Sequence, residues 1–172
     1  MQNIISSLAS VWYKLPKNEG HLEFPAHILE YMSKYQQTCF WHKEAGGQLF
    51  WEYTNEGKKR VSAITGPRNT DQRSRYRYKP DHTKEQREID EFYNQGLYLL
   101  GDWHTHAQKA PKPSTDDIHA IQEIFSRSIN PGAGLLLVIV GTAPIRTSIN
   151  VSFCTSSGVV SLNQVAPPNG NP

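Results

Sequence analysis

The stretch Gly101-Asp-Trp-His-Thr-His-Ala-Gln-Lys-Ala-Pro-Lys-Pro-Ser-Thr-Asp-Asp117 decides the fold that this sequence predicts. The residues before it, 96–100, are apolar and begin with a glycine, which is typical of a buried strand. Because side chains two apart on a strand point the same way, His104 and His106 are expected to project side by side. Residues 107–113 contain two prolines and no apolar run, so they predict a loop.

A helix is expected to begin directly after this loop. Ile118, Ile121 and Ile124 recur at helical spacing. Ser114 is a suitable N-cap, and Asp117 falls in the first turn. The loop can bring that turn back beside the strand end, which would place Asp117 next to the two imidazoles. Two histidines and one aspartate, with a fourth position left open, are the ligand count of a catalytic zinc site.

Each half of this motif has an ordinary structural interpretation. A histidine pair on a strand is often structural or exposed, and Ser-x-x-Asp before an apolar run is often only a capping box. The combination is more specific, because His-x-His, ten residues and Asp, with Ser three before the Asp, lie on the strand–loop–helix that the site needs. We therefore predict one zinc ion per chain, held by His104, His106 and Asp117.

This motif resembles the metal signature of the JAMM (MPN+) metallopeptidases. In that family a glutamate at the start of another strand completes the site, and Glu44-Ala-Gly-Gly-Gln-Leu-Phe50 has the matching form. The resemblance extends from about Trp12 to beyond residue 155, and it departs at Ala107, where the family commonly has proline. It implies an α/β fold, a single-domain JAMM/MPN-like sandwich with a mixed, curved β-sheet flanked by helices.

The resemblance also implies a chemistry. Glu44 would act as general base and pass its proton to the leaving amine. Ser114 would donate a hydrogen bond to the developing oxyanion. Asp102 shares a strand face with the histidines and is expected to support a ligand histidine as an outer partner. The substrates implied are isopeptides that join a ubiquitin-like tail to a target.

Two further segments narrow the resemblance. Trp12-x-x-x-Pro16 and Trp103-His-Thr-His106 resemble the bacterial JAMM peptidases of CBASS anti-phage operons. Such proteins remove a cGAS-like nucleotidyltransferase from the target to which an E1–E2-like protein has attached it. The implied partner is a protein with an extended C-terminal tail, either a cGAS-like cyclase or a ubiquitin-like conjugate. Two alternatives stay open: a JAMM peptidase of another ubiquitin-like or sulfur-carrier pathway, and a catalytically silent MPN scaffold.

Length and composition favour one globular domain in a reducing compartment. The chain has 172 residues, 37% of them hydrophobic, and a net charge of +2. We divide it into a lead-in (1–11), a JAMM/MPN-like domain (12–163) and a disordered tail (164–172). We expect neither a signal peptide nor a membrane span. Two cysteines, Cys39 and Cys154, do not make a disulfide framework, so we expect a cytoplasmic protein without a membrane partner.

The remaining apolar patterns predict the other elements. Two helices are expected, over 26–37 and over 82–95, the second with Ile89, Phe92 and Tyr93 directed inward. Strands are expected over residues 11–15, 48–53, 60–65, 135–140, 147–154 and 159–162.

A basic stretch follows Gly66-Pro67, with four cations at alternate positions: Arg73, Arg75, Arg77 and Lys79. If this stretch is extended, one face is cationic and the other aromatic. One interpretation is a solvated edge that discourages aggregation. The other is a dock for an acidic protein surface, with nucleic acid the less favoured partner. Docking predicts that charge reversal raises KM for a protein substrate in a salt-sensitive way.

Overall fold

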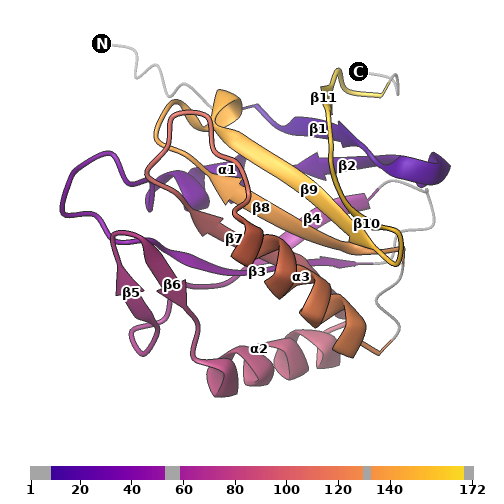
Figure 1. The fold of residues 1–172 in the computed structure, drawn as a ribbon. Coiled ribbons are helices and arrows are strands. Elements are labelled where there is room, and N and C mark those ends of the chain that lie inside the picture. The colour runs from indigo at the N-terminus through magenta and orange to yellow at the C-terminus, as the bar shows by residue number, and fades with distance from the viewer. Residues whose placement is uncertain (1–8, 53–58, 130–132, 169–172) are drawn as a thin grey trace, which may run out of the picture.

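A computed structural model describes residues 9–52, 59–129 and 133–168 (Figure 1). Within these ranges the α-helices are α1 (Ala26–Ser33), α2 (His82–Asn94) and α3 (Thr115–Arg127). The strands are β1 (Val11–Lys14), β2 (His21–Phe24), β3 (Gly46–Glu52), β4 (Lys59–Ile64), β5 (Gln72–Ser74), β6 (Arg77–Lys79), β7 (Leu97–Thr105), β8 (Leu135–Val140), β9 (Ile149–Thr155), β10 (Gly158–Ser161) and β11 (Gln164–Val165). None of the described helices has the length and apolar character of a membrane span.

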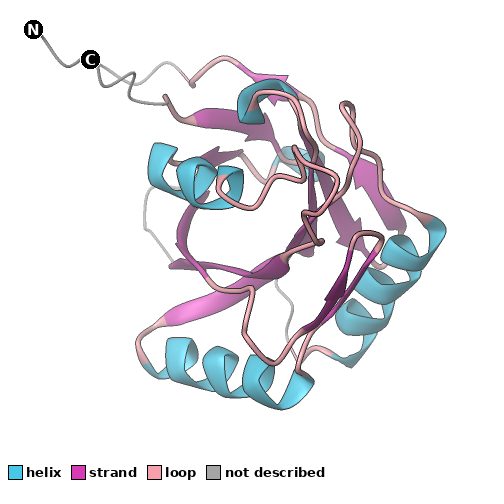
Figure 2. Ribbon diagram, turned by 90° about the vertical axis from the view of Figure 1, so that its left-hand side faces the viewer, coloured by secondary structure: helices cyan, strands magenta, loops and turns pink. Residues whose placement is uncertain are grey.

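Nine strands form one mixed sheet in the order β10-β9-β8-β7-β3-β4-β2-β1-β11, and β5 and β6 form a separate hairpin. The pairs β7–β8 and β2–β4 are parallel, and the other neighbours in the sheet are antiparallel. Figure 2 shows that the sheet is strongly curved and that helices flank it. The predicted α/β sandwich with a mixed, curved sheet is therefore confirmed.

Strand β8 separates two apolar cores, and every one of its residues is buried. Leu136, Val138 and Val140 join the larger core, which also contains the buried face of α1. The alternate residues of β8 join a second core with Ile121 of α3. Because alternate side chains of a strand point to opposite faces, α1 and α3 cover opposite faces of the sheet.

Aromatic rings contribute to the packing of helix α2 on the sheet. The Phe92 ring stacks on Phe50 of β3 at a centroid distance of 4.2 Å. Tyr93, which the sequence analysis directs inward, is 63% exposed, so that prediction is wrong. The helical positions of Phe92 and Tyr93 are about 100° apart. Phe92 therefore lies over the buried Phe50, whereas Tyr93 meets the exposed Tyr98 of β7 edge-on at a centroid distance of 5.6 Å. Asp81 caps the helix by accepting hydrogen bonds from the Thr83 and Lys84 amides.

Replacing Phe92 with Ala is expected to lower the free energy of unfolding by about 2 kcal/mol, less than for a fully buried phenylalanine because this ring is only half-buried. Tyr93→Ala is the matched control, because it removes a neighbouring ring that is mostly exposed, and its expected loss is under about 1 kcal/mol. Urea denaturation measures both. Equal losses in the two variants would mean that the Phe50 contact does not hold α2.

Other sequence predictions need smaller corrections. The helix predicted over 26–37 ends at Ser33, and the next residues continue as turns in which Tyr35 and Gln36 amides bond carbonyls three residues back. Strand β2 was not predicted, although its four residues alternate between half-buried and buried positions, with Leu22 and Phe24 in the core. The tail predicted to be disordered from 164 begins with β11, whose two residues pair with β1; residues 169–172 and most of the lead-in lie outside the described ranges.

Candidate metal centre and catalytic cleft

The end of β7 carries the two histidines. His104 lies on the strand opposite Gly46 of β3 and Ile139 of β8, and His106 follows one residue beyond the strand end. Thr105, between them, is buried and points to the other face, where its Oγ1 accepts a hydrogen bond from the Ala45 amide at 2.9 Å. The His106 amide donates to the Val140 carbonyl at 2.8 Å. The backbone of both ligands is thus held between neighbouring strands.

Helix α3 supplies the carboxylate. Ser114 is the N-cap: its Oγ accepts a hydrogen bond from the Asp117 amide at 3.1 Å, and the Ser114 amide donates to Asp117 Oδ2 at 2.6 Å. This is a complete capping box, the structural interpretation of Ser-x-x-Asp. It is compatible with a role in a metal site, because the box orients the Asp117 carboxylate toward the end of β7.

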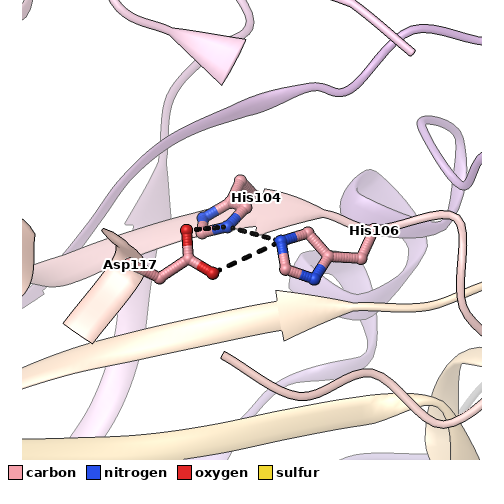
Figure 3. Close-up of side chains that lie close together, drawn as sticks. All are labelled: His104, His106 and Asp117. Carbon is pink, nitrogen blue, oxygen red and sulfur yellow. Dashed lines mark hydrogen bonds and ion pairs between the residues drawn. The ribbon is translucent and has the colours of Figure 1, made fainter. Parts of the chain in front are cut away.

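The three predicted ligands converge on one point (Figure 3). His104 Nε2 lies 3.1 Å from His106 Nε2 and 3.1 Å from Asp117 Oδ1. His106 Nε2 lies 3.4 Å from Asp117 Oδ2. One donor atom from each residue falls within 4.8 Å of the others. Two imidazole nitrogens and one carboxylate oxygen match the donors that zinc takes at catalytic sites, so the residues present fit this metal.

The electrostatics of the ligands favour the forms that bind a cation. Burial opposes ionisation of Asp117, but hydrogen bonds from His104 and Ser114 hold the pKa of its carboxyl well below the usual range. Burial, together with the neighbouring His104, lowers the pKa of His106. The carboxylate is therefore ionised and His106 is neutral near pH 7, the protonation states that metal ligands require.

Glu44 lies just before β3, in the same cleft. Ala45 follows it, and then Gly46 and Gly47, which have no room for side chains. A Cβ on Gly47 would lie 2.0 Å from the Thr65 carbonyl oxygen, and one on Gly46 would lie 2.6 Å from the Trp103 carbonyl oxygen. The glycine pair therefore lets β3 pass close to its neighbours. This close approach brings Glu44 to the C-terminal end of β7, where His104 lies. Burial raises the pKa of Glu44 to about 7, against the effect of His104 and with a further rise from Asp117.

A cleft of about 720 Å³ joins these groups. Glu44, Ser114 and Asp102 line it together with the three ligands. The hydroxyl proton of Ser114 stays available as a donor, because Oγ acts as acceptor in the capping box. Asp102 faces the cleft as predicted, but no hydrogen bond to either histidine is present within the described residues. Its support of a ligand histidine therefore stays a prediction.

The basic stretch does not form one cationic face. It folds back at Arg75 and Tyr76 into the β5–β6 hairpin, in which Arg73 pairs with Tyr78 and Ser74 with Arg77. Arg73 and Arg75 direct their guanidinium groups at backbone carbonyls of residues 39–44, which gives them intramolecular partners. The prediction of a single extended ribbon is wrong. Docking by Arg73, Arg75, Arg77 and Lys79 stays a prediction, and Arg77 and Lys79 are the exposed members of the set.

Two contributors to the site were not predicted. Gln108 lines the cleft with His106 and raises the pKa of that ring against the effect of burial, and its Oε1 accepts a hydrogen bond from the Lys112 amide at 3.3 Å. Thr105 joins the start of β3 to the end of β7. Strand alternation places Thr105 on the buried face, but its partner Ala45 is 60 residues away, and no sequence pattern gives that register.

Comparison with known proteins gives a consistent result. The family described as prokaryotic homologues of the JAB domain (Prok-JAB) matches residues 25–152. A protein of Escherichia coli (strain TW11681) named CD-NTase/cGAS isopeptidase is 26% identical over 103 residues, covering 58% of this chain and 65% of that protein. One of the same name from Vibrio cholerae is 30% identical over 118 residues, covering 67% and 72%. The chain thus spans just under two thirds of the first relative.

Solved structures support the fold alone. The solution structure of a protein from Desulfitobacterium hafniense has a TM-score of 0.52 at 19% identity, and covers 78% of this chain and 82% of its own. A second, from Salinibacter ruber, has a TM-score of 0.51 at 16% identity, with 87% and 92% covered. Since the family match covers most of the chain and includes Glu44 and the three ligands, this chain belongs to the prokaryotic homologues of the JAB domain, within the JAMM/MPN family that its motif resembles.

Proposed function

We propose that this protein is a zinc isopeptidase that releases a cGAS-like nucleotidyltransferase from the target to which its C-terminal tail is joined. The observation that carries the proposal is the convergence of the three ligand atoms in a cleft that Glu44 and Ser114 also line. The names of the two relatives, both called CD-NTase/cGAS isopeptidase, supply the substrate. The reaction would belong to CBASS immunity, downstream of an E1–E2-like protein.

His104, His106 and Asp117 would hold the zinc ion. When bound there, zinc would supply Lewis acidity, which polarises a carbonyl and makes water a nucleophile near neutral pH. Glu44 would accept the proton of the attacking water, and its pKa of about 7 suits a group that must both take and return a proton. Ser114 would donate its hydroxyl proton in a hydrogen bond to the oxygen that becomes negative.

The bond changes in this reaction balance without another reactant. Water adds to the scissile carbonyl carbon, and the carbon–nitrogen bond to the lysine ε-amine breaks. Glu44 carries the water proton to that nitrogen, so the tail leaves with a free carboxylate and the target regains its lysine. Both cysteines are free thiols, which agrees with a reducing cytoplasm, where we propose that the protein acts.

The test uses a cyclase joined through its C-terminal carboxylate to the lysine ε-amine of a reporter protein. We expect the zinc-loaded protein to release intact cyclase and reporter, with a new cyclase C-terminus in mass spectra, and a zinc chelator to stop release. Ubiquitin–lysine and sulfur-carrier fusions are the comparison substrates. Preference for one of these would favour the other JAMM pathways, and a zinc-loaded protein that cleaves none would favour the silent scaffold.

A further inference from the structure

The β5–β6 hairpin holds the segment that carries Glu44. Arg73 Nε donates a hydrogen bond to the Glu44 carbonyl oxygen at 2.6 Å. In return the Glu44 amide donates to the Ser74 carbonyl oxygen at 2.7 Å. Both main-chain polar groups of Glu44 are therefore bonded to β5, which is not part of the large sheet.

Arg75 attaches the preceding residues to the same hairpin. Its Nη1 donates to the carbonyl oxygens of Cys39 and Phe40 at 3.0 and 2.7 Å. The buried Gln37 side chain donates back to the Arg75 carbonyl oxygen at 2.7 Å. Residues 37–44 are thus joined to the hairpin near both of their ends. In most of these hydrogen bonds the donor is a charged guanidinium group, and such bonds are stronger than bonds between neutral groups.

The large sheet alone does not fix Glu44 in this way. Its ladder reaches the segment through Ala45, whose amide and carbonyl both bond Thr105, and β3 begins only at Gly46. Glu44 stands outside the strand, and the bonds that its own amide and carbonyl make go to β5 and not to the large sheet. Within the described residues, the hairpin therefore supplies the restraint on the Glu44 main chain itself, while the large sheet restrains its neighbour Ala45.

We propose that Arg73 is a positioning residue for the general base, and that the β5–β6 hairpin holds Glu44 at the place from which it can reach the reacting water. The inference rests on the proposed function of Glu44. Arg73 acts through the Glu44 carbonyl and is not one of the residues that line the cleft. Proton transfer requires heavy atoms within hydrogen-bonding reach, and a displacement of about 1 Å can reduce rate about 100-fold.

Replacing Arg73 with Ala is expected to lower kcat on the cyclase–lysine probe about 10- to 100-fold, with KM and zinc content unchanged. Arg73→Lys keeps a cationic donor and is expected to recover a large part of kcat. Gln72→Ala is the matched control, since Gln72 is an exposed neighbour on β5, and it should retain the wild-type kcat. Hydrogen exchange of the Glu44 amide, measured by NMR, should be faster in Arg73→Ala than in the wild type.

Three results would overturn the proposal. The first is a wild-type kcat in Arg73→Ala. The second is a salt-sensitive rise of KM at constant kcat, which would make Arg73 a docking residue, one of the two interpretations that the sequence leaves open. The third is an unchanged exchange rate at the Glu44 amide. That last measurement needs no substrate, so it decides whether Arg73 fixes Glu44 even if the wild type cleaves none of the probes and the proposed function fails.

Discussion

Replacing Glu44 with Gln is expected to lower kcat on the cyclase–lysine probe about 100- to 10,000-fold, the range that a general acid–base group typically contributes. The amide has nearly the same shape as the carboxylate, so the cleft and the bonds to Arg73 and Ser74 should persist. It cannot accept the proton of the attacking water. Single-turnover kinetics at saturating zinc measures the loss.

Glu30→Gln is the matched control, because it removes the charge of an exposed glutamate on α1, outside the cleft. It should cleave at the wild-type rate. Zinc content and the midpoint of thermal unfolding should be the same in both variants. A Glu44→Gln protein that cleaves normally would remove Glu44 from the mechanism, and one that loses zinc would make Glu44 a ligand.

Removing both histidines is the second change with a large expected effect. The double variant His104→Ala/His106→Ala should fall from one zinc per chain to none, and its activity should fall to background. Only Asp117 would remain of the three donors, and a single carboxylate does not hold zinc in competition with water. Inductively coupled plasma mass spectrometry of the purified proteins gives the stoichiometry, and measuring iron alongside identifies the metal.

His27→Ala tests whether the loss is specific, since His27 is exposed on α1. This variant should keep both zinc and activity. Zinc binds only the folded site, so it should also raise the unfolding midpoint of the wild type and not that of the double variant. A double variant that retains one zinc per chain would place the metal elsewhere in the protein.

The sequence predicts the site better than its surroundings, for a physical reason. His104 and His106 are two residues apart on a strand, and Ser114 and Asp117 are three apart at a helix start, so local geometry alone orients each pair. Glu44 is 60 residues from His104, and only the glycine pair after it marks the position. A glycine pair indicates that two strands approach closely. In the structure Gly46 pairs with His104, so this close approach lies at the metal site.

The hairpin could not be predicted in the same way. Its turn at Arg75 and Tyr76 contains no glycine, proline or asparagine, so alternation continued through it and indicated one long ribbon. The destinations of Arg73 and Arg75 depend on carbonyl groups about 30 residues earlier. Such contacts depend on the tertiary structure. From the sequence, the arginine side chains predict a positive charge but not the carbonyl groups that they bind.

Strands β10 and β11 stand at opposite ends of the sheet order, yet only Leu162 and Asn163 separate them along the chain. One short segment therefore covers β9 and then β1, and the Leu162 amide bonds the Val151 carbonyl on the way. An unpaired strand edge is a template on which other chains add and aggregate. Residues 164–165, which the sequence assigns to a disordered tail, thus pair the outer edge of β1, and removing them would expose that edge to other chains.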